Sequence, residues 1–85
     1  MARPVRVLLF ATARTAVGHA ELEWAVSASG TTARDLVRDL TARYPALARV
    51  ARSSRFVRNG RYVERMTDRV KPGDEFAVHP PYGGG

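Results

Sequence analysis

Three short segments of the chain have the hydrophobic patterns of β-strands. Residues 5–11 are mostly apolar and include the β-branched residues Val5 and Val7, which predicts a buried strand. Residues 21–26 alternate between polar and apolar side chains, and residues 75–79 alternate in the same way near the C-terminus. We expect the first two strands to form an antiparallel hairpin, and the first and last strands to pair in parallel at the centre of one sheet.

Residues 32–44 have the pattern of an amphipathic helix. Thr32 can cap the free N–H groups of the first turn, and Asp35 three positions later suits both a capping box and the positive end of the helix. The apolar stripe that follows consists of Leu36, Val37, Leu40 and Tyr44. Pro45 ends this helix, and residues 46–50 are expected to add another turn.

Glycine and proline mark the turns between these elements. Residues 13–18 predict a short helical turn that closes on a glycine. The Asn-Gly pair at positions 59–60 supplies the positive φ angles of a tight hairpin between short strands at 55–58 and 62–63. The Pro-Gly-Asp run at 72–74 predicts a further turn before the last strand.

The predicted order of elements is strand, strand, helix and then short strands, which is typical of an α+β fold. One main helix then covers one face of a mixed sheet, as in a β-grasp. We expect a single domain over residues 1–81 and a flexible glycine tail over residues 82–85. A domain of this length buries roughly 60–65% of its unfolded surface. That leaves little capacity for a deep active site and favours a binding or carrier module.

The chain is basic, with a net charge of +6. Such a charge favours acidic partners, of which nucleic acid is the first candidate. However, the arginines are spread from Arg3 to Arg69, which is typical of a solvated surface and disfavours a nucleic-acid partner. Five of them recur at every third position: Arg49, Arg52, Arg55, Arg58 and Arg61. That stretch crosses a predicted helix end, a strand and a turn, so the repeat need not form one stripe.

Several kinds of chemistry are excluded or disfavoured by composition. The chain has no cysteine, which excludes disulfides, thiolate metal sites and a catalytic thiol. His19 and His79 lie far apart in the sequence without a cluster of carboxylates, which disfavours a metal site. No apolar run approaches the roughly 20 residues of a membrane span, and the start lacks the apolar segment of a signal peptide. We therefore expect a cytoplasmic location and no membrane partner.

The last six residues, Pro-Pro-Tyr-Gly-Gly-Gly, are the most unusual feature of the sequence. The prolines direct the chain away from the sheet in an extended form, and the glycines make a thread without Cβ atoms that can enter a narrow channel in a partner. The chain ends in the carboxylate of Gly85. Adenylation by ATP gives that carboxylate a good leaving group, AMP, so that a sulfur or nitrogen nucleophile can attack. The alternative is that terminal glycines are simply disordered or a cloning remnant, which the preceding strand and prolines disfavour.

A set of short features in a fixed order spans the whole chain. They are Phe10-Ala11 with Arg14 and Gly18, Thr32 with Leu36 and Leu40, Tyr44-Pro45-Ala46-Leu47, Asn59-Gly60, Gly73-Asp74-Glu75-Phe76, Pro80-Pro81 and Gly84-Gly85. Together they resemble the MoaD/ThiS family of ubiquitin-like sulfur carriers, and most of all the small, sulfur-carrier subunits of molybdopterin synthase. The final segment is the most specific part of the resemblance.

The resemblance implies a ubiquitin-like β-grasp fold and a cycle of activation and sulfur delivery. A ubiquitin-activating-type enzyme adenylates Gly85 with ATP and magnesium, so the chain itself binds no cofactor and no metal. A cysteine desulfurase or a rhodanese supplies the sulfur that converts Gly85 to a thiocarboxylate. The large subunit of molybdopterin synthase, or another sulfur-acceptor enzyme, then receives the tail formed by Pro81, Tyr82, Gly83, Gly84 and Gly85. The acceptor of the sulfur is cyclic pyranopterin monophosphate, and the chain is not catalytic alone.

Two positions depart from the pattern of this family. Tyr82 stands where a small aliphatic residue is usual, and Gly83 stands where serine or alanine is usual. The departures leave the recipient of the sulfur open, because related carriers serve thiamine, cysteine, thiolated tRNA or sulfur-containing secondary metabolites.

Two other functions remain open from the sequence. A ubiquitin-like modifier would transfer the same adenylated Gly85 to a lysine amine, and a basic β-grasp domain would bind nucleic acid without needing a diglycine end. Phe10, Tyr62 and Phe76 are candidates for docking the activating enzyme on an exposed sheet face, with ordinary core packing as the alternative for each.

Overall fold

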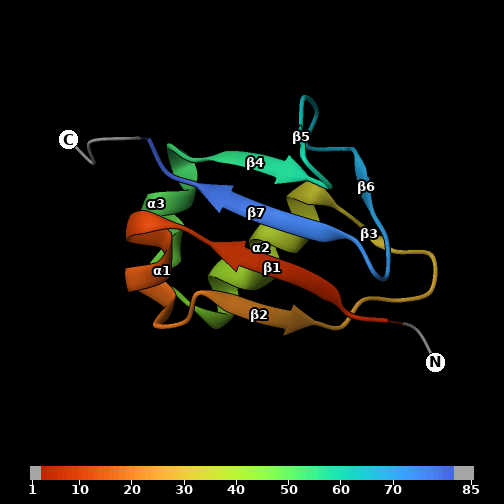
Figure 1. Ribbon diagram of the computed structural model, residues 1–85, viewed down its shortest axis with the longest axis horizontal. Helices are drawn as coiled ribbons and strands as arrows, with labels where there is room; N and C mark the ends of the chain where they lie inside the picture. The colour runs from red at the N-terminus through yellow and green to blue at the C-terminus, as the bar shows by residue number, and fades with distance from the viewer. Residues whose placement is uncertain (1–2, 82–85) are drawn as a thin grey trace.

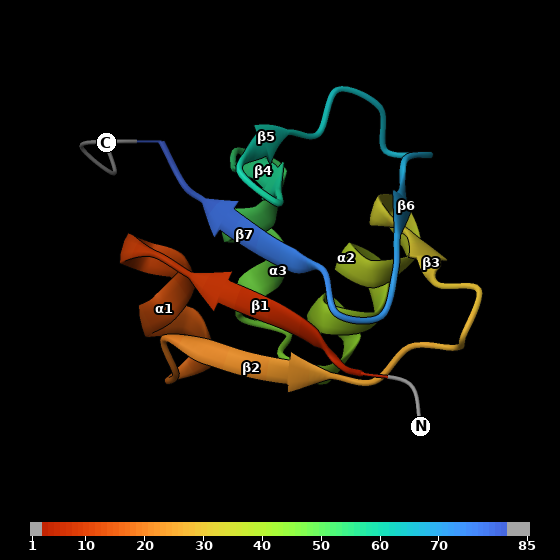
Figure 2. The same cartoon turned by 45° about the vertical axis from the view of Figure 1, so that its right-hand side comes forward.

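A mixed β-sheet with helices packed on one of its faces makes up the body of the protein (Figure 1, Figure 2). The computed structural model describes residues 3–81. In chain order its elements are β1 (Val5–Leu9), α1 (Ala11–Val17), β2 (Glu21–Trp24), β3 (Thr31–Thr32), α2 (Ala33–Arg43), α3 (Leu47–Arg52), β4 (Arg55–Arg58), β5 (Arg61–Tyr62), β6 (Arg69–Val70) and β7 (Glu75–His79).

The main sheet has the strand order β2-β1-β7-β4-β5. β1 and β7 pair in parallel at its centre, with Val7 opposite Phe76, while β2 and β4 flank them as antiparallel neighbours. The first and last strands of the chain therefore lie side by side, and α2 crosses the face of the sheet behind them (Figure 1). This is the β-grasp arrangement, and the α+β prediction is confirmed.

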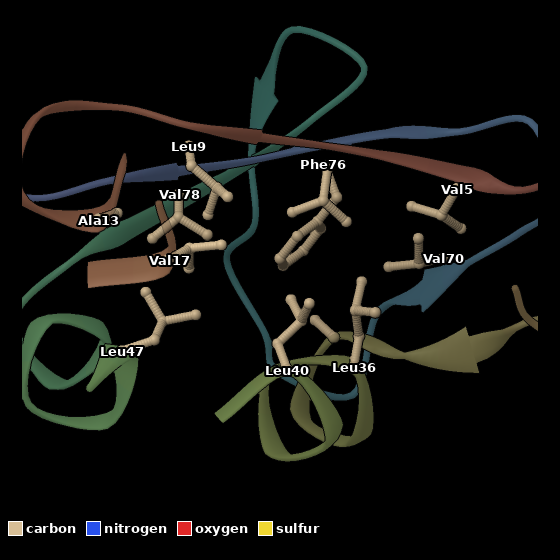
Figure 3. Close-up of a cluster of buried hydrophobic side chains, with 12 residues drawn as sticks. Val5, Leu9, Ala13, Val17, Leu36, Leu40, Leu47, Val70, Phe76 and Val78 are labelled. Carbon is tan, nitrogen blue, oxygen red and sulfur yellow. The ribbon is translucent and has the colours of Figure 1, made fainter. Parts of the chain in front are cut away.

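The core lies between the sheet and the helices (Figure 3). Alternate side chains of β1 and β7 point toward α2 and α3, because successive side chains of a strand face opposite sides of the sheet. The buried residues labelled there are Val5, Leu9, Ala13, Val17, Leu36, Leu40, Leu47, Val70, Phe76 and Val78. Burying each of the larger side chains contributes about 1.5–3 kcal/mol. None of the buried side chains within residues 3–81 is polar or charged, so the core is held by apolar packing.

The predicted signals at the ends of α2 are confirmed. The Oγ1 atom of Thr32 accepts a hydrogen bond from the backbone N–H of Asp35 at 3.1 Å. The helix ends at Arg43, two residues before Pro45. The further turn predicted after this proline is present as the six-residue helix α3.

The first helix begins earlier than the sequence predicts. The apolar pattern favours a strand through residue 11, but β1 ends at Leu9 and Phe10 is the N-cap residue of α1. The carbonyl oxygen of Phe10 accepts a hydrogen bond from the backbone N–H of Ala13 at 2.9 Å, which turns the chain away from β1. The predicted glycine ending is confirmed, since the C-cap Gly18 has a left-handed φ of 86°.

The Asn-Gly hairpin turn between β4 and β5 is also confirmed, with φ angles of 49° at Asn59 and 82° at Gly60. The side chain of Asn59 has a further role that the sequence does not predict. Its Oδ1 atom accepts a hydrogen bond from the Glu75 backbone N–H at 2.8 Å, and its Nδ2 atom donates to Asp74 at 3.1 Å. These bonds attach the β4–β5 turn to the start of β7.

A second, two-stranded sheet is absent from the sequence prediction. In it, Thr31 of β3 pairs with Val70 of β6. Each strand has only two residues, too short for an alternating pattern to be recognised. Gly30 allows the approach, because a Cβ atom at this position, where φ is 82°, would collide with the carbonyl oxygen of Val70.

Candidate functional site at the end of the central strand

The chain leaves the sheet from its best-supported strand. β7 is hydrogen-bonded to β1 on one side and to β4 on the other, and its residues Phe76, Ala77 and Val78 are buried. Pro80 and Pro81 follow directly; neither has an N–H group to continue the pairing. The base of the C-terminal tail is therefore anchored on a rigid element.

An aromatic stack lies on the β1 side of this base. The rings of Phe10 and His79 are stacked with centroids 4.4 Å apart and an interplanar angle of 13°. The backbone N–H of Phe10 also donates to the carbonyl oxygen of Val78 at 3.3 Å. Aromatic pairs of this kind contribute about 0.5–1.5 kcal/mol beyond the area they bury. The stack thus fixes the last residue of β7 against the start of α1.

A shallow groove lies on the β4 side. Its lining residues are Ser53, Arg55, Val57, Tyr62, His79, Pro80 and Pro81. Arg55 is opposite His79 in the β4–β7 pair, and its guanidinium lies 5.2 Å from the centre of the Tyr62 ring. Because that contact is a cation–π interaction, the arginine is held over the open face of the sheet. None of the groove's lining residues within 3–81 carries a carboxylate.

The sheet face away from the helices is apolar near the tail and charged at its far end. Near the tail it presents Leu8 of β1 and Phe10, the residue directly after this strand, together with Val57 and Tyr62 from the β4–β5 hairpin. Leu8 and Val57 alternate with the core residues of their strands. At the far end Arg6 forms ion pairs with Glu21 and Glu75, at 3.3 and 3.9 Å. Phe10 is 43% exposed and Tyr62 63% exposed. We call the four apolar residues near the tail the open apolar patch.

Known proteins share this fold. The model of the ThiS family matches residues 7–85, which is nearly the whole chain and includes the terminal glycines. The chain belongs to the ThiS family.

The relatives of this ThiS family member fall into two groups by name. A "Molybdopterin synthase sulfur carrier subunit" from Chlamydomonas reinhardtii is 34% identical over 82 residues, covering 95% of this chain and 98% of the relative. A "Putative molybdopterin converting factor, subunit 1" from Pyrococcus furiosus is 27% identical with a TM-score of 0.81, covering 94% of this chain and 99% of that one. The crystal structure of SAMP1 from Haloferax volcanii is also 27% identical with a TM-score of 0.81, covering 95% and 98% of the two chains. SAMP1 from Methanosarcina acetivorans, a "small archaeal modifier protein", is 30% identical with a TM-score of 0.79, covering 100% and 99%. These similarities confirm the predicted resemblance and the ubiquitin-like β-grasp fold.

The structure separates the three predicted docking residues. Phe10 and Tyr62 belong to the open apolar patch, but the docking prediction is wrong for Phe76. Its side chain is 0% exposed and stacks on Phe56 at 5.6 Å on the helix side of the sheet. The pattern of β7 explains this, because Phe76 and its neighbour Ala77 face opposite sides of the sheet.

Of the predicted tail, only Pro81 is within the described residues, where it is exposed. Tyr82, Gly83, Gly84 and Gly85 lie outside them, so the reactive role of Gly85 and the division of the chain at residue 81 stay predictions. Within residues 3–81 there is no group of three or more His, Cys, Asp or Glu residues placed to hold a metal ion. None of the described helices has the length and apolar character needed to cross a membrane.

Sequence reasoning missed His79 and Arg55 as parts of this site. The signal for both was available in the register of the strands. Parallel pairing of the first and last strands brings the residue after β1 beside the end of β7, and the hairpin of residues 55–62 adds Arg55 on the other side. Pairing partners, and not neighbours in the sequence, assemble the site.

Proposed function

We propose that the chain is a sulfur carrier whose reacting group is the C-terminal carboxylate of Gly85. The observation that carries this proposal is that the family match continues through Gly85, a few residues beyond the anchored end of β7. An anchored strand end and a thread without Cβ atoms are what a partner enzyme needs to draw a chain end into a narrow active site.

The chemistry follows from the nature of a carboxylate. In the first step the carboxylate attacks the α-phosphate of ATP, forms an acyl adenylate and releases pyrophosphate. In the second step a persulfide sulfur attacks the acyl carbon and AMP leaves with one of the original oxygens. Reductive cleavage of the sulfur–sulfur bond by a thiol then leaves the thiocarboxylate. The adenylating enzyme, with its ATP and magnesium, and the sulfur source are partners, and this chain contributes the acyl carbon.

The open apolar patch is the surface on which such a partner docks. Phe10 and Tyr62 are exposed aromatic side chains beside the base of the tail, and exposed aromatic residues are enriched at the energetic centres of interfaces. A partner that covers this patch is already in position to receive the residues after Pro81.

For the recipient of the sulfur, we propose the large subunit of molybdopterin synthase. This is supported by the similarity to the Chlamydomonas protein, which is named as a sulfur carrier subunit of that enzyme. A second candidate is a ubiquitin-like modifier that joins Gly85 to lysine amines, supported by the similarity to two proteins named SAMP1.

Intact-mass spectrometry separates the two functions. The chain is co-expressed with an adenylating enzyme and a cysteine desulfurase and then purified without reductant. A sulfur carrier shows the mass increase of one oxygen replaced by sulfur and, with the large subunit, converts cyclic pyranopterin monophosphate to molybdopterin. If the only products are covalent conjugates of the whole chain with lysines of other proteins, the modifier function holds and the carrier function is rejected.

A further inference from the structure

The net positive charge of the protein is concentrated in one part of the chain. Residues 40–63 contain six arginines and no aspartate or glutamate. The other eight basic residues are balanced by all eight acidic residues, so the entire net charge of +6 resides in this stretch. In the fold it comprises the end of α2, all of α3 and the β4–β5 hairpin.

Three of these arginines belong to α3 and the start of β4, the segment that borders the base of the tail, and we call them the basic pole: Arg49, Arg52 and Arg55. Arg49 and Arg52 are three residues apart on α3, which places them on the same side of that helix. Arg55 is opposite His79 in the sheet. Ser53, which connects α3 toward β4, lines the same groove as Pro80 and Pro81. Figure 1 shows α3 at the end of the molecule where β7 ends.

The arginines of the basic pole are exposed and have no acidic partner within residues 3–81. The ion pairs of the described part involve Arg6, Arg38 and Arg58 instead. Within the same residues, Arg55 makes a cation–π contact with the Tyr62 ring. Three like charges without neutralisation create a positive potential at the point where the tail begins.

We propose that the basic pole binds an acidic surface of the protein partner that takes the tail. This inference rests on the proposed function. A partner that covers Tyr62 and receives the residues after Pro81 must also lie against Arg55, because that guanidinium contacts the Tyr62 ring. Guanidinium groups pair well with carboxylates, and charges at the edge of an interface act mainly on association and partner choice.

Nucleic acid is the other polyanion that such a surface can attract, and the geometry favours protein. Binding along a nucleic-acid backbone depends on many phosphate contacts, about 6–10 in strongly salt-dependent complexes. The other arginine of β4, Arg58, does not extend the basic pole. It is opposite Phe76, near the far end of the sheet, and its side chain is paired with Asp74 at 3.7 Å. Three arginines next to an apolar patch suit the rim of a protein interface better.

The test compares two triple variants of equal charge. In the first, Arg49, Arg52 and Arg55 are each changed to Gln. In the matched control, three exposed basic residues outside residues 40–63 whose side chains form no ion pair within residues 3–81 are changed to Gln: Arg34, Arg65 and Lys71. The partner is the adenylating enzyme of the ubiquitin-activating type from the same genome. Its affinity for each variant is measured by calorimetry, and its KM for each variant by ATP–pyrophosphate exchange.

At about 0.1 M salt, where the Debye length is about 10 Å, we expect the basic-pole variant to raise Kd and KM roughly 10-fold and leave kcat within about 2-fold. The control variant should change each by less than about 2-fold. At about 1 M salt, where the Debye length is about 3 Å, the three proteins should bind alike. Thermal unfolding of each variant establishes that the fold is kept.

Equal effects of the two triple variants would mean that only net charge matters and would overturn the proposal. Binding to a single-stranded RNA oligonucleotide is measured in parallel by fluorescence anisotropy. If the basic-pole variant loses RNA binding but keeps its affinity for the enzyme, the basic pole binds nucleic acid and the proposal is overturned. If the two proteins form a salt-sensitive complex but Gly85 is not adenylated, the proposed function is rejected, while binding of the basic pole to an acidic protein surface is still supported. Adenylation with unchanged Kd in the basic-pole variant rejects the acidic partner alone, and absence of any complex with the original protein rejects both.

Discussion

The two faces of the central sheet are built from the same strands but perform different work. On the helix side, Val7 and Phe76 from the two central strands are completely buried. On the other side lie Leu8 of β1 and Phe10, directly after it, which belong to the open apolar patch. The helices of the described residues pack against the opposite face of the sheet (Figure 2). A shift of one residue along a strand therefore exchanges a position in the core for one on the open face.

In a domain this small, the core occupies one face of the sheet and leaves the other face free for contacts. The helix face contains nearly all of the apolar packing, and that packing must offset the conformational entropy of the chain. The open face and the tail are therefore available for contacts with other molecules. Substitutions on the helix face should therefore lower stability, and substitutions on the open face or in the tail should lower activity.

The largest effect is expected from deletion of Gly85. Without it the acyl carbon sits one residue short of its position in the partner's active site, so thiocarboxylate formation should fall below detection by intact mass. Adding one alanine after Gly85 should have the same effect although every original residue is kept. Both variants should unfold at the same temperature as the original protein. Sulfur transfer at the original rate by either variant would show that the terminal residue is not the reacting group.

The next comparison uses the same substitution on the two faces. Phe76→Ala removes a completely buried ring and should cost about 3–5 kcal/mol of the free energy of unfolding, measured by urea denaturation. Phe10→Ala removes a partly exposed ring and its stack with His79, and should cost about 1 kcal/mol. Similar losses in the two variants would contradict the assignment of stability to the helix face.

Substitutions in the open apolar patch should reduce binding affinity more than stability. A double variant, Phe10→Ala with Tyr62→Ala, is expected to weaken binding to the adenylating enzyme by about 2–4 kcal/mol, because exposed aromatic residues dominate interfaces of this kind. Calorimetric titration measures this loss. As a control in the same sheet, Glu23→Ala changes an exposed residue of β2 away from the tail and should leave the affinity within about 0.5 kcal/mol. Unaltered binding by the double variant would place the docking surface elsewhere.

The smallest effect is expected at the start of α2. Thr32→Ala removes the hydroxyl that accepts the Asp35 N–H and should cost about 1 kcal/mol of stability. Thr32→Ser keeps an oxygen at the cap and serves as the control. Since Thr32 lies at the opposite end of the fold from the tail, neither change should alter the rate of thiocarboxylate formation at temperatures where the protein is folded. A reduced rate in the folded variant would show that the two regions are coupled.

Local patterns in the sequence were sufficient for most of the fold. The alternation in β2 and β7, the cap and stripe of α2, and the Asn-Gly turn each specify an element through neighbours a few residues apart, and each is confirmed. The boundary of β1 was predicted wrongly because apolar residues continue into α1, where a hydrogen bond to the Phe10 carbonyl oxygen turns the chain. The β3–β6 sheet has too few residues to produce a pattern.

The functional site divides in the same way. The glycine tail and its two prolines are chemical features of consecutive residues, and so the sequence alone points to a reactive C-terminus and to the ThiS family. Two of the contacts at the base of the tail join residues far apart in the chain: Phe10 stacks on His79, and Arg55 is the pairing partner of His79 in the sheet. Burial of Phe76 and concentration of the arginines of α3 and β4 beside the tail likewise depend on strand register and helix packing. The sequence predicts that the first and last strands pair, but the register of β7 against β1 and β4 decides which side chains meet, and the packing of the core, not a local pattern, fixes that register.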